Sequence, residues 1–264
     1  MYCKVIDKKG RQAYNDQHEQ GRSSEEGRVS GSEACFPLMN ALTFWSDHDT
    51  KGEEAMLREG QVRIPSGCAV SGIFAKDGRR LSGEAIIKSI SIMHDRSNGL
   101  GGGFAGYGIY PEYKEHYAFH VFYDDKAAKE ACENFIDGHF DVVNLSKIPV
   151  RKTPKITDEP LIWRYFVNPL PTKLKDSQLD EREYTARCVM RINTRIEGAY
   201  VFSSGKNMGV FKAVGFPEDV GNFYRLEEYS GYCWTAHGRY PTNTPGWWGG
   251  AHPFAMLDYS VVHN

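Results

Sequence analysis

The chain has 264 residues, and its 32 basic and 34 acidic side chains leave a formal net charge of −2. Such a balanced composition provides no global field that would attract nucleic acid or an anionic membrane. No apolar run approaches the roughly 20 residues that a membrane-spanning helix needs, and the N-terminus lacks the apolar segment of a secretory signal. The 6 cysteines stand at wide, irregular spacings, which favours thiols in a reducing cytoplasm over a disulfide scaffold. We therefore expect a cytoplasmic globular protein with neither nucleic acid nor a membrane as a partner.

The N-terminal quarter of the chain is mostly polar. Within it, residues 16–28 have almost nothing apolar to bury, which predicts a loop or a disordered stretch. We interpret residues 1–67 as a polar leader or pro-segment rather than as a domain.

From Cys68 onward the pattern is that of a folded domain. Residues 69–75 predict a strand, and Ser82 can cap a helix that extends to about Asp95, because apolar residues recur there at helical spacing. A glycine-rich stretch at residues 100–108 predicts the start of another strand.

Residues 116–204 show a different rhythm, in which strands and helices alternate. Strands are predicted at 117–123, 140–145, 161–167 and 199–203, with helices from about Lys126 and over 177–194. This βαββαβ order is the split pattern of ferredoxin-like folds. We predict an inserted α+β subdomain at 116–204, after which the chain returns to the first domain at residues 205–264.

Three short motifs follow one another near the end of the chain. Residues 237–240 read H-G-R-Y, residues 251–253 read A-H-P, and residues 261–264 read V-V-H-N. Upstream, Cys68 opens the string C-x-V-x-G-I-F. In this order and spacing the motifs resemble the signature of class II glutamine amidotransferases.

The resemblance covers Cys68 to about Gly108 and then residues 205–264. It implies an α+β fold, the four-layer αββα sandwich of N-terminal-nucleophile hydrolases, interrupted by the ferredoxin-like insertion. The amidotransferase domain would then consist of a first part at 68–115 and a second, incomplete part at 205–264.

The family's reaction is hydrolysis of the glutamine side-chain amide, which needs a nucleophile, a base, donors for the oxyanion and a grip on the substrate's own charges. The resemblance implies that Cys68 is the nucleophile and that the amide of Asn264 donates to the oxyanion. Arg239 would hold the α-carboxylate, since its planar, permanently charged fork suits that group. Tyr240 and Thr242 fall where the family places an aromatic residue and a threonine near the nucleophile.

The sequence departs from the family's pattern in several places. The family's nucleophile is the first residue of the mature chain, and its α-amine, with a pKa of about 8, moves the proton. Cys68 meets this requirement only if residues 1–67 are removed or if another base acts. Ala69 and Gly250 replace a glycine and an asparagine of the family. Because the sequence stops at Asn264, one residue before the oxyanion glycine, we interpret it as C-terminally truncated.

Within the family, three strings point to one subgroup. Residues 64–67, 98–101 and 241–248 are most similar to the glutaminase subunit of archaeal-type glutamate synthase. That similarity implies that glutamine becomes glutamate and that ammonia passes to a synthase subunit carrying flavin and iron–sulfur cofactors. No cofactor is expected in this chain itself.

Two alternatives remain open. The chain could be a non-catalytic regulatory or assembly subunit that keeps the fold and binds an amino acid through Arg239, as Ala69, Gly250 and an unprocessed Cys68 would suggest. It could also be an inactive fragment of a longer amidotransferase.

Other motifs favour structural roles. His237 and His252 are interpreted as hydrogen-bonded structural residues, since the mechanism needs no imidazole. Alternation along a strand would place His116 and His120 on one face, but no further ligands accompany them, so no metal site is predicted. Residues 101–106 match G-x-G-x-x-G without the preceding strand and following helix that dinucleotide binding requires.

Overall fold

Residues 67–241 and 243–263 are described by the computed structural model. The leader predicted at residues 1–67 lies outside these residues apart from Gly67, and so do two predicted site residues, Thr242 and Asn264.

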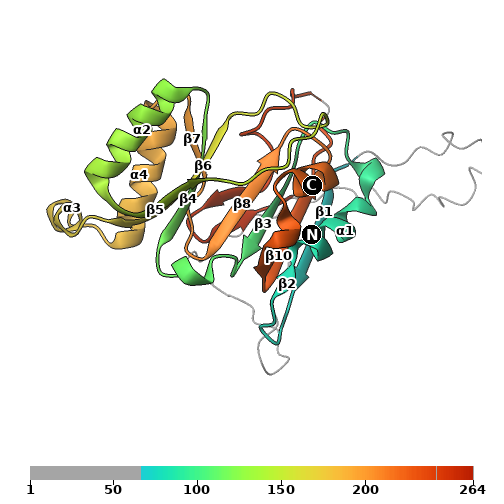
Figure 1. Ribbon diagram of the computed structural model, residues 1–264, viewed down its shortest axis with the longest axis horizontal. Helices are drawn as coiled ribbons and strands as arrows, with labels where there is room; N and C mark the ends of the chain where they lie inside the picture. Colours follow the sequence, from blue (N-terminus) through green and yellow to red (C-terminus); the bar gives the residue numbers. More distant parts are fainter. Residues whose placement is uncertain (1–66, 242, 264) are drawn as a thin grey trace, which may run out of the picture. The chain divides into compact units, whose positions relative to one another are not determined.

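The first sheet has four antiparallel strands in the order β1-β10-β3-β8 (Figure 1). These strands are β1 (Ala69–Phe74), β3 (Gly102–Tyr107), β8 (Met208–Ala213) and β10 (Cys233–Gly238). Helices α1 (Gly83–Ser91) and α5 (Pro217–Phe223) pack on one face of it. Gly102 permits this close approach, because a Cβ there would lie 2.9 Å from the Cα of Pro217.

Helix α1 begins where the sequence predicts. The side chain of Ser82 accepts a hydrogen bond from the amide of Glu84 and so caps the helix, whose buried face is formed by Ile86, Ile87 and Ile90. The helix ends at Ser91, earlier than predicted, and a short 3-10 helix, η1 (His94–Arg96), follows it.

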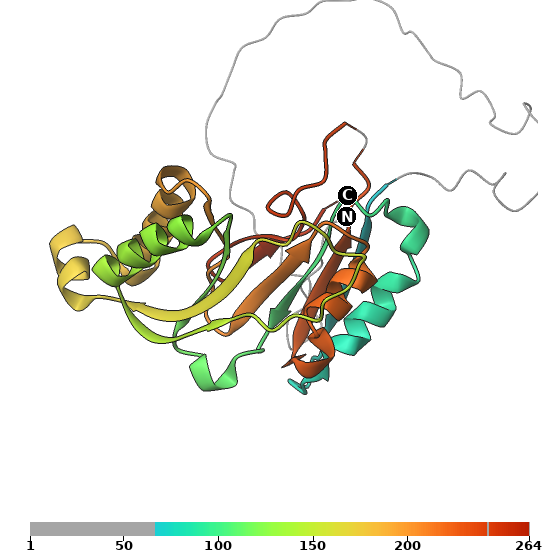
Figure 2. The ribbon, with the colours of Figure 1, turned by 45° about the horizontal axis from the view of Figure 1, so that its top comes forward.

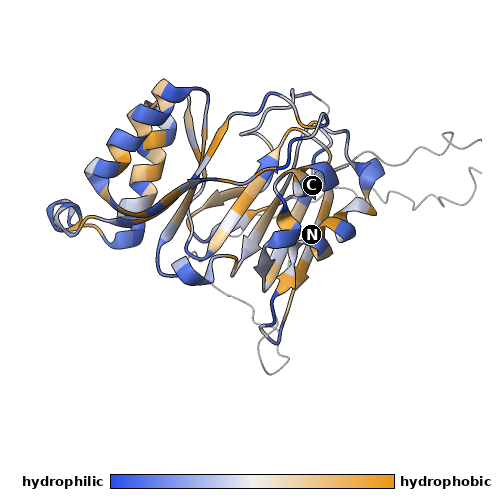
Figure 3. Ribbon diagram, viewed as in Figure 1, coloured by the Kyte–Doolittle hydropathy of each residue, from blue (hydrophilic) through white to orange (hydrophobic). Residues whose placement is uncertain are grey.

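The second sheet also has four antiparallel strands, in the order β5-β6-β4-β7. They are β4 (Tyr117–Tyr123), β5 (Phe140–Lys147), β6 (Leu161–Pro169) and β7 (Ala199–Ser203). Helices α2 (Lys126–His139) and α4 (Glu181–Arg195) pack on its outer face, each with apolar residues toward the sheet and polar ones elsewhere (Figure 3). The predicted βαββαβ element order is thus observed.

One helix boundary in this region was predicted wrongly. The helix expected from Ser177 begins at Glu181, because Asp180 caps it by accepting a hydrogen bond from the amide of Glu183. Ser177 instead ends a separate short helix, α3 (Pro171–Ser177), and Gln178 after it adopts a left-handed conformation that breaks the helical path.

Strand β4 shows how the second sheet is covered on both faces. All of its residues are buried. Tyr117, Phe119 and Val121 belong to the cluster beneath α2 and α4, whereas Ala118 and Phe122 belong to the cluster shared with the first sheet. A strand covered on both sides needs apolar residues at nearly every position, which explains why this stretch is so rich in them.

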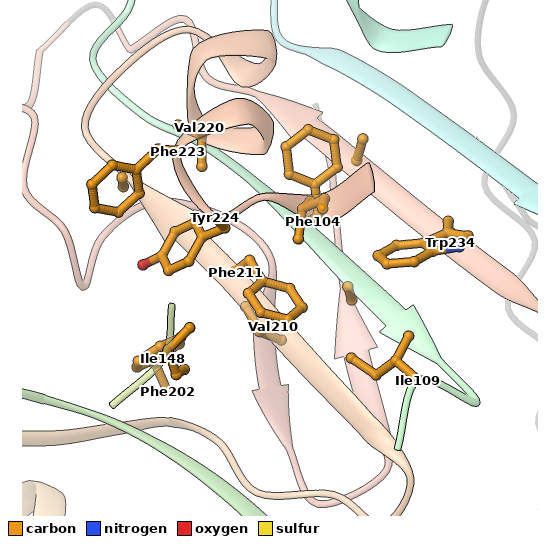
Figure 4. Close-up of a cluster of buried hydrophobic side chains, with 14 of the residues drawn as sticks. Phe104, Ile109, Ile148, Phe202, Val210, Phe211, Val220, Phe223, Tyr224 and Trp234 are labelled. Carbon is orange, nitrogen blue, oxygen red and sulfur yellow. The ribbon is translucent and has the colours of Figure 1, made fainter. Parts of the chain in front are cut away.

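The two sheets share one hydrophobic core. The cluster that contains Phe104 and Phe211 of the first sheet also contains Phe202 of the second (Figure 4). Phe122 of the second sheet belongs to it too, and its ring stacks on that of Phe202 at 3.8 Å. Residues 116–204 therefore supply two of the four layers, and they are not packed apart from the rest. The segment boundaries predicted at 68, 116 and 205 stay a prediction.

The layers follow one another as helices, sheet, sheet and helices, as Figure 2 shows from a second direction. The predicted four-layer α+β sandwich is confirmed. Shorter elements complete it: β2 (Leu81–Ser82) pairs with β9 (Ser230–Gly231), β11 (Phe254–Met256) pairs with β12 (Tyr259–Val261), and η2 (Pro111–Tyr113) and η3 (Leu226–Glu228) are 3-10 turns.

Candidate active site

The strand register brings the predicted site residues to one end of the first sheet. Gly238, the last residue of β10, pairs with Ala69 at the start of β1 and with Gly102 at the start of β3. Cys68 and Arg239 are the next residues outward on β1 and β10, so they lie side by side. The amide of Tyr240 donates a hydrogen bond to the Cys68 Sγ at 3.4 Å, and the thiol is half-buried.

The backbone of Arg239 is held from both neighbouring segments. Its amide donates to the Gly101 carbonyl at 2.8 Å, and its carbonyl accepts hydrogen bonds from the Ser97 hydroxyl at 3.1 Å and the Asn98 amide at 3.3 Å. Because Ser97 is buried and its hydroxyl is bonded to the Arg239 carbonyl, it fixes the backbone position of Arg239. Sequence reasoning missed Ser97, since only the pairing of distant strands brings it to the site.

The guanidinium of Arg239 points to the loop that follows β10. Its Nη1 donates to the carbonyl of Pro245 at 3.2 Å, and its Nη2 donates to the hydroxyl of Thr244. We call residues 243–250 the 243–250 loop. The guanidinium has five donors, so these two bonds leave others for a carboxylate.

The string at residues 98–101 forms a tight turn beside Arg239. The side chain of Asn98 accepts a hydrogen bond from the Leu100 amide and donates one to the carbonyl of Pro241 at 3.2 Å. Gly99 has a φ of +76°, a conformation that suits glycine. Asn98 therefore holds the backbone of Arg239 and of Pro241, the two residues on either side of Tyr240.

The presence of glycine at position 250 is explained by a contact with Trp247. A Cβ at this position would lie 2.1 Å from the Nε1 of Trp247, so the indole occupies the space that a side chain would need. The asparagine that the family has here is thus incompatible with the observed position of Trp247.

Three histidines lie next to one another behind the site. The rings of His237 and His252 stack at 4.4 Å, His263 packs edge-on against His252 at 4.5 Å, and the His237 Nε2 donates to the His263 carbonyl at 2.8 Å. Burial lowers the pKa of His237 to about 4 and that of His252 to about 3, with the neighbouring cationic groups adding to the effect. Both rings are therefore neutral at neutral pH, which fits the structural role expected of them.

The other two histidines singled out in the sequence do not form a site together. His120 is fully buried and contacts the Tyr110 hydroxyl and the Val210 carbonyl, whereas His116 precedes β4 and contacts Asn168. Among the residues that the structure describes, no group of three or more His, Cys, Asp or Glu side chains is arranged to hold a metal ion. Nor does that part of the chain contain a helix long and apolar enough to cross a membrane.

A cavity of about 700 Å³ lies beside the 243–250 loop. Tyr200, Trp247 and Gly249 form part of its wall, together with charged side chains from α4 and from the loops that follow β4 and α4 or precede β6. Neither Cys68 nor Arg239 lines this cavity. We therefore place the candidate chemistry at the end of the first sheet and not in the cavity.

The structure brings Cys68, Arg239 and Tyr240 together, and Thr242 and Asn264 lie outside the described residues.

A family described as "Glutamine amidotransferases class-II" matches residues 111–264. An uncharacterized protein of Archaeoglobus fulgidus is 54% identical over 200 residues, which cover 75% of this chain and 53% of the relative. This chain thus spans about half the length of the relative that it matches. With more than half of its residues matched, the chain belongs to the family of class II glutamine amidotransferases.

Proposed function

We propose that this protein is a glutaminase that hydrolyses the side-chain amide of glutamine with Cys68 as its nucleophile. The observation that carries the proposal is the contact between the Cys68 thiol and the Tyr240 amide. It sets a nucleophilic sulfur beside the segment that follows β10, next to the residue Arg239 whose guanidinium contacts the 243–250 loop. The family match begins at residue 111 and does not include Cys68, so the role of the cysteine rests on this geometry and on the sequence motif.

The proposed reaction has two steps. The Cys68 thiolate attacks the side-chain carbonyl carbon of glutamine, and ammonia leaves with a proton from the base, so that a thioester remains. Water then attacks the thioester, which releases glutamate and restores the thiol. If the Gly67–Cys68 peptide bond is cleaved, the α-amine of Cys68 can serve as the base, because its pKa of about 8 suits proton transfer near neutral pH.

Two further groups complete the proposed site. Arg239 would bind the α-carboxylate with the donors that Thr244 and Pro245 leave available. Asn264 would donate to the oxyanion, and it directly follows His263, whose carbonyl is bonded to His237. Tyr240 and Thr242 would line the substrate's path to the thiol.

The proposed acceptor is a synthase subunit with flavin and iron–sulfur cofactors, which would use the ammonia to make glutamate. The support is the sequence similarity of the 98–101 turn and the 241–248 stretch to archaeal-type glutaminase subunits. A cytoplasmic setting fits the free thiols on the buried faces of α2 and α4, Cys132 and Cys188.

The second candidate is a non-catalytic subunit that keeps the amidotransferase fold. The observation in its favour is that both ends of the Arg239 guanidinium already contact the 243–250 loop. Ammonia release from glutamine distinguishes the two. The glutaminase proposal predicts release that Cys68→Ala abolishes and that Cys233→Ala, a matched change at another half-buried cysteine, preserves. Glutamate binding without ammonia release in any of these proteins would support the non-catalytic subunit.

A further inference from the structure

Lys212 is a fully buried lysine on β8 that the proposed reaction does not use. It pairs with Gly103 of β3, and a Cβ on that glycine would lie 2.8 Å from the Lys212 Cβ and 2.2 Å from the His252 carbonyl. The missing side chain at Gly103 therefore makes room for the lysine stem. An apolar residue would be the ordinary choice at a position so deep in the sheet.

The amine of Lys212 lies among aromatic rings and one carbonyl. Its Nζ donates to the Gly249 carbonyl at 2.8 Å and lies 4.7 Å from the ring centre of Phe254 and 5.3 Å from that of Tyr200. Lys212 forms no salt bridge with any described residue. Burial therefore lowers its pKa from 10.5 to about 7.

Apart from the Gly249 carbonyl and the two rings, no described group packed around the amine compensates its charge, and desolvation prevails. His237 on β10 and His252 are neutral at neutral pH for the reasons given above. After the end of α5, the Tyr224 hydroxyl donates to the Lys212 carbonyl at 2.9 Å, and Gly103, the residue of β3 that pairs with Lys212, has no side chain. The environment thus disfavours the ammonium form and accepts the neutral amine.

The contact at Gly249 links Lys212 to Arg239. Gly249 belongs to the same 243–250 loop, whose Thr244 and Pro245 contact the guanidinium. The loop is further fixed by the buried Trp248, whose Nε1 donates to the Thr157 carbonyl at 3.3 Å.

The cavity of about 700 Å³ lies on the other side of this contact, since Tyr200 and Gly249 both line it. If Gly249 moves away, the amine is exposed to this space. The charged residues that line the cavity are Asp124, Asp158, Arg195 and Glu197. Three carboxylates against one guanidinium would favour an ammonium there, which the closed position does not.

We propose that Lys212 is a positioning residue that couples its own protonation to the position of the 243–250 loop. The neutral amine stays beneath Gly249 and keeps the loop on Arg239, whereas the ammonium turns toward the cavity and releases the loop. The consequence for glutamine rests on the proposed function, because it requires Arg239 to bind the substrate. The proposed movement of the loop does not depend on whether Arg239 binds glutamine.

The test is hydrogen exchange of the peptide 243–253 in the full chain at pH 6 and pH 8, corrected for the intrinsic dependence of exchange on pH. Opening that hydrates Lys212 returns its pKa toward 10.5, so loop protection should rise up to about tenfold between these two pH values. The peptide of α3 serves as an internal control and should not change. Equal protection of the loop at both pH values in the wild type overturns the proposal without any variant.

Variants then assign the effect to Lys212. Lys212→Met should remove the pH dependence of loop protection, and Lys114→Met, at an exposed lysine, should retain it. A pH-dependent loop in Lys212→Met would overturn the assignment. The KM for glutamine should fall from pH 6 to pH 8 in the wild type if the proposed function is correct. A pH-dependent loop in a protein that releases no ammonia would support the role of Lys212 and reject the glutaminase.

Discussion

Replacing Lys212 with methionine should change how the stability of the protein depends on pH. Between pH 7 and 10.5 the unfolded chain carries a proton on Lys212 that the folded chain lacks, because burial lowers the folded pKa from 10.5 to about 7. The unfolded state therefore binds more protons in this window, and the free energy of unfolding rises with pH. Methionine does not titrate, so the variant loses this contribution.

The magnitude follows from the two pKa values. Each pH unit of difference is worth about 1.4 kcal/mol, which gives a penalty of roughly 4 kcal/mol for the buried lysine at pH 7 and roughly 2 kcal/mol at pH 9. The wild type should thus gain about 2 kcal/mol relative to Lys212→Met between pH 7 and pH 9. Groups that titrate in both proteins cancel in this comparison.

The assay is urea unfolding of the wild type, Lys212→Met and Lys114→Met at pH 7, 8 and 9, followed by circular dichroism. The difference between the wild type and Lys212→Met should change with pH, while the difference between the wild type and Lys114→Met should stay constant. Parallel pH profiles for the wild type and Lys212→Met would refute the reasoning, because they would mean that the amine keeps its charge in the folded state.

Three further changes test the site and its surroundings. Arg239→Lys should raise the KM for glutamine roughly tenfold or more, since a lysine cannot pair with a carboxylate through two parallel bonds; a lower kcat with an unchanged KM would contradict a role in binding. Gly250→Ala should displace Trp247, alter tryptophan fluorescence and destabilise the fold by about 1–3 kcal/mol, because the new Cβ would meet the indole; an unchanged spectrum would argue against the observed packing. His237 has a pKa lowered by burial to about 4, so the free energy of unfolding should fall as the pH drops from 6.5 to 4. In His237→Gln the free energy of unfolding, measured by urea titration, should fall less between pH 6.5 and pH 4. An unchanged fall in this variant would show that His237 does not cause it.

The layers and most strands could be predicted from the sequence because their signals are local. Ser82 caps α1 by accepting a hydrogen bond from the amide of Glu84, only two residues away. The apolar run of β4 indicates a strand that is covered on both faces. The break between α3 and α4 was missed because Ser177 and Asp180 both suit a helix start, and only the path at Gln178 decides between them.

The site could be predicted only in part, for a different reason. Cys68 and Arg239 stand in motifs, and the register of β1 and β10 then places them together. Ser97 and Lys212 have no motif, since their roles depend on contacts with Arg239 and Gly249 that arise only when distant segments pack. The only sequence feature that points to Lys212 is its place within the apolar stretch of β8. The structure then shows that it is buried and is not a surface charge.

The central claim, that Cys68 is the nucleophile of a glutamine site, is tested most directly by intact mass spectrometry. The protein is incubated with a diazo-ketone analogue of glutamine, and the modified peptide is then identified. The account predicts one adduct on Cys68 that glutamine prevents, that Cys68→Ala abolishes and that Cys233→Ala retains. The same spectrum shows whether residues 1–67 have been removed. An adduct that persists in Cys68→Ala, or one that glutamine does not prevent, would contradict the claim.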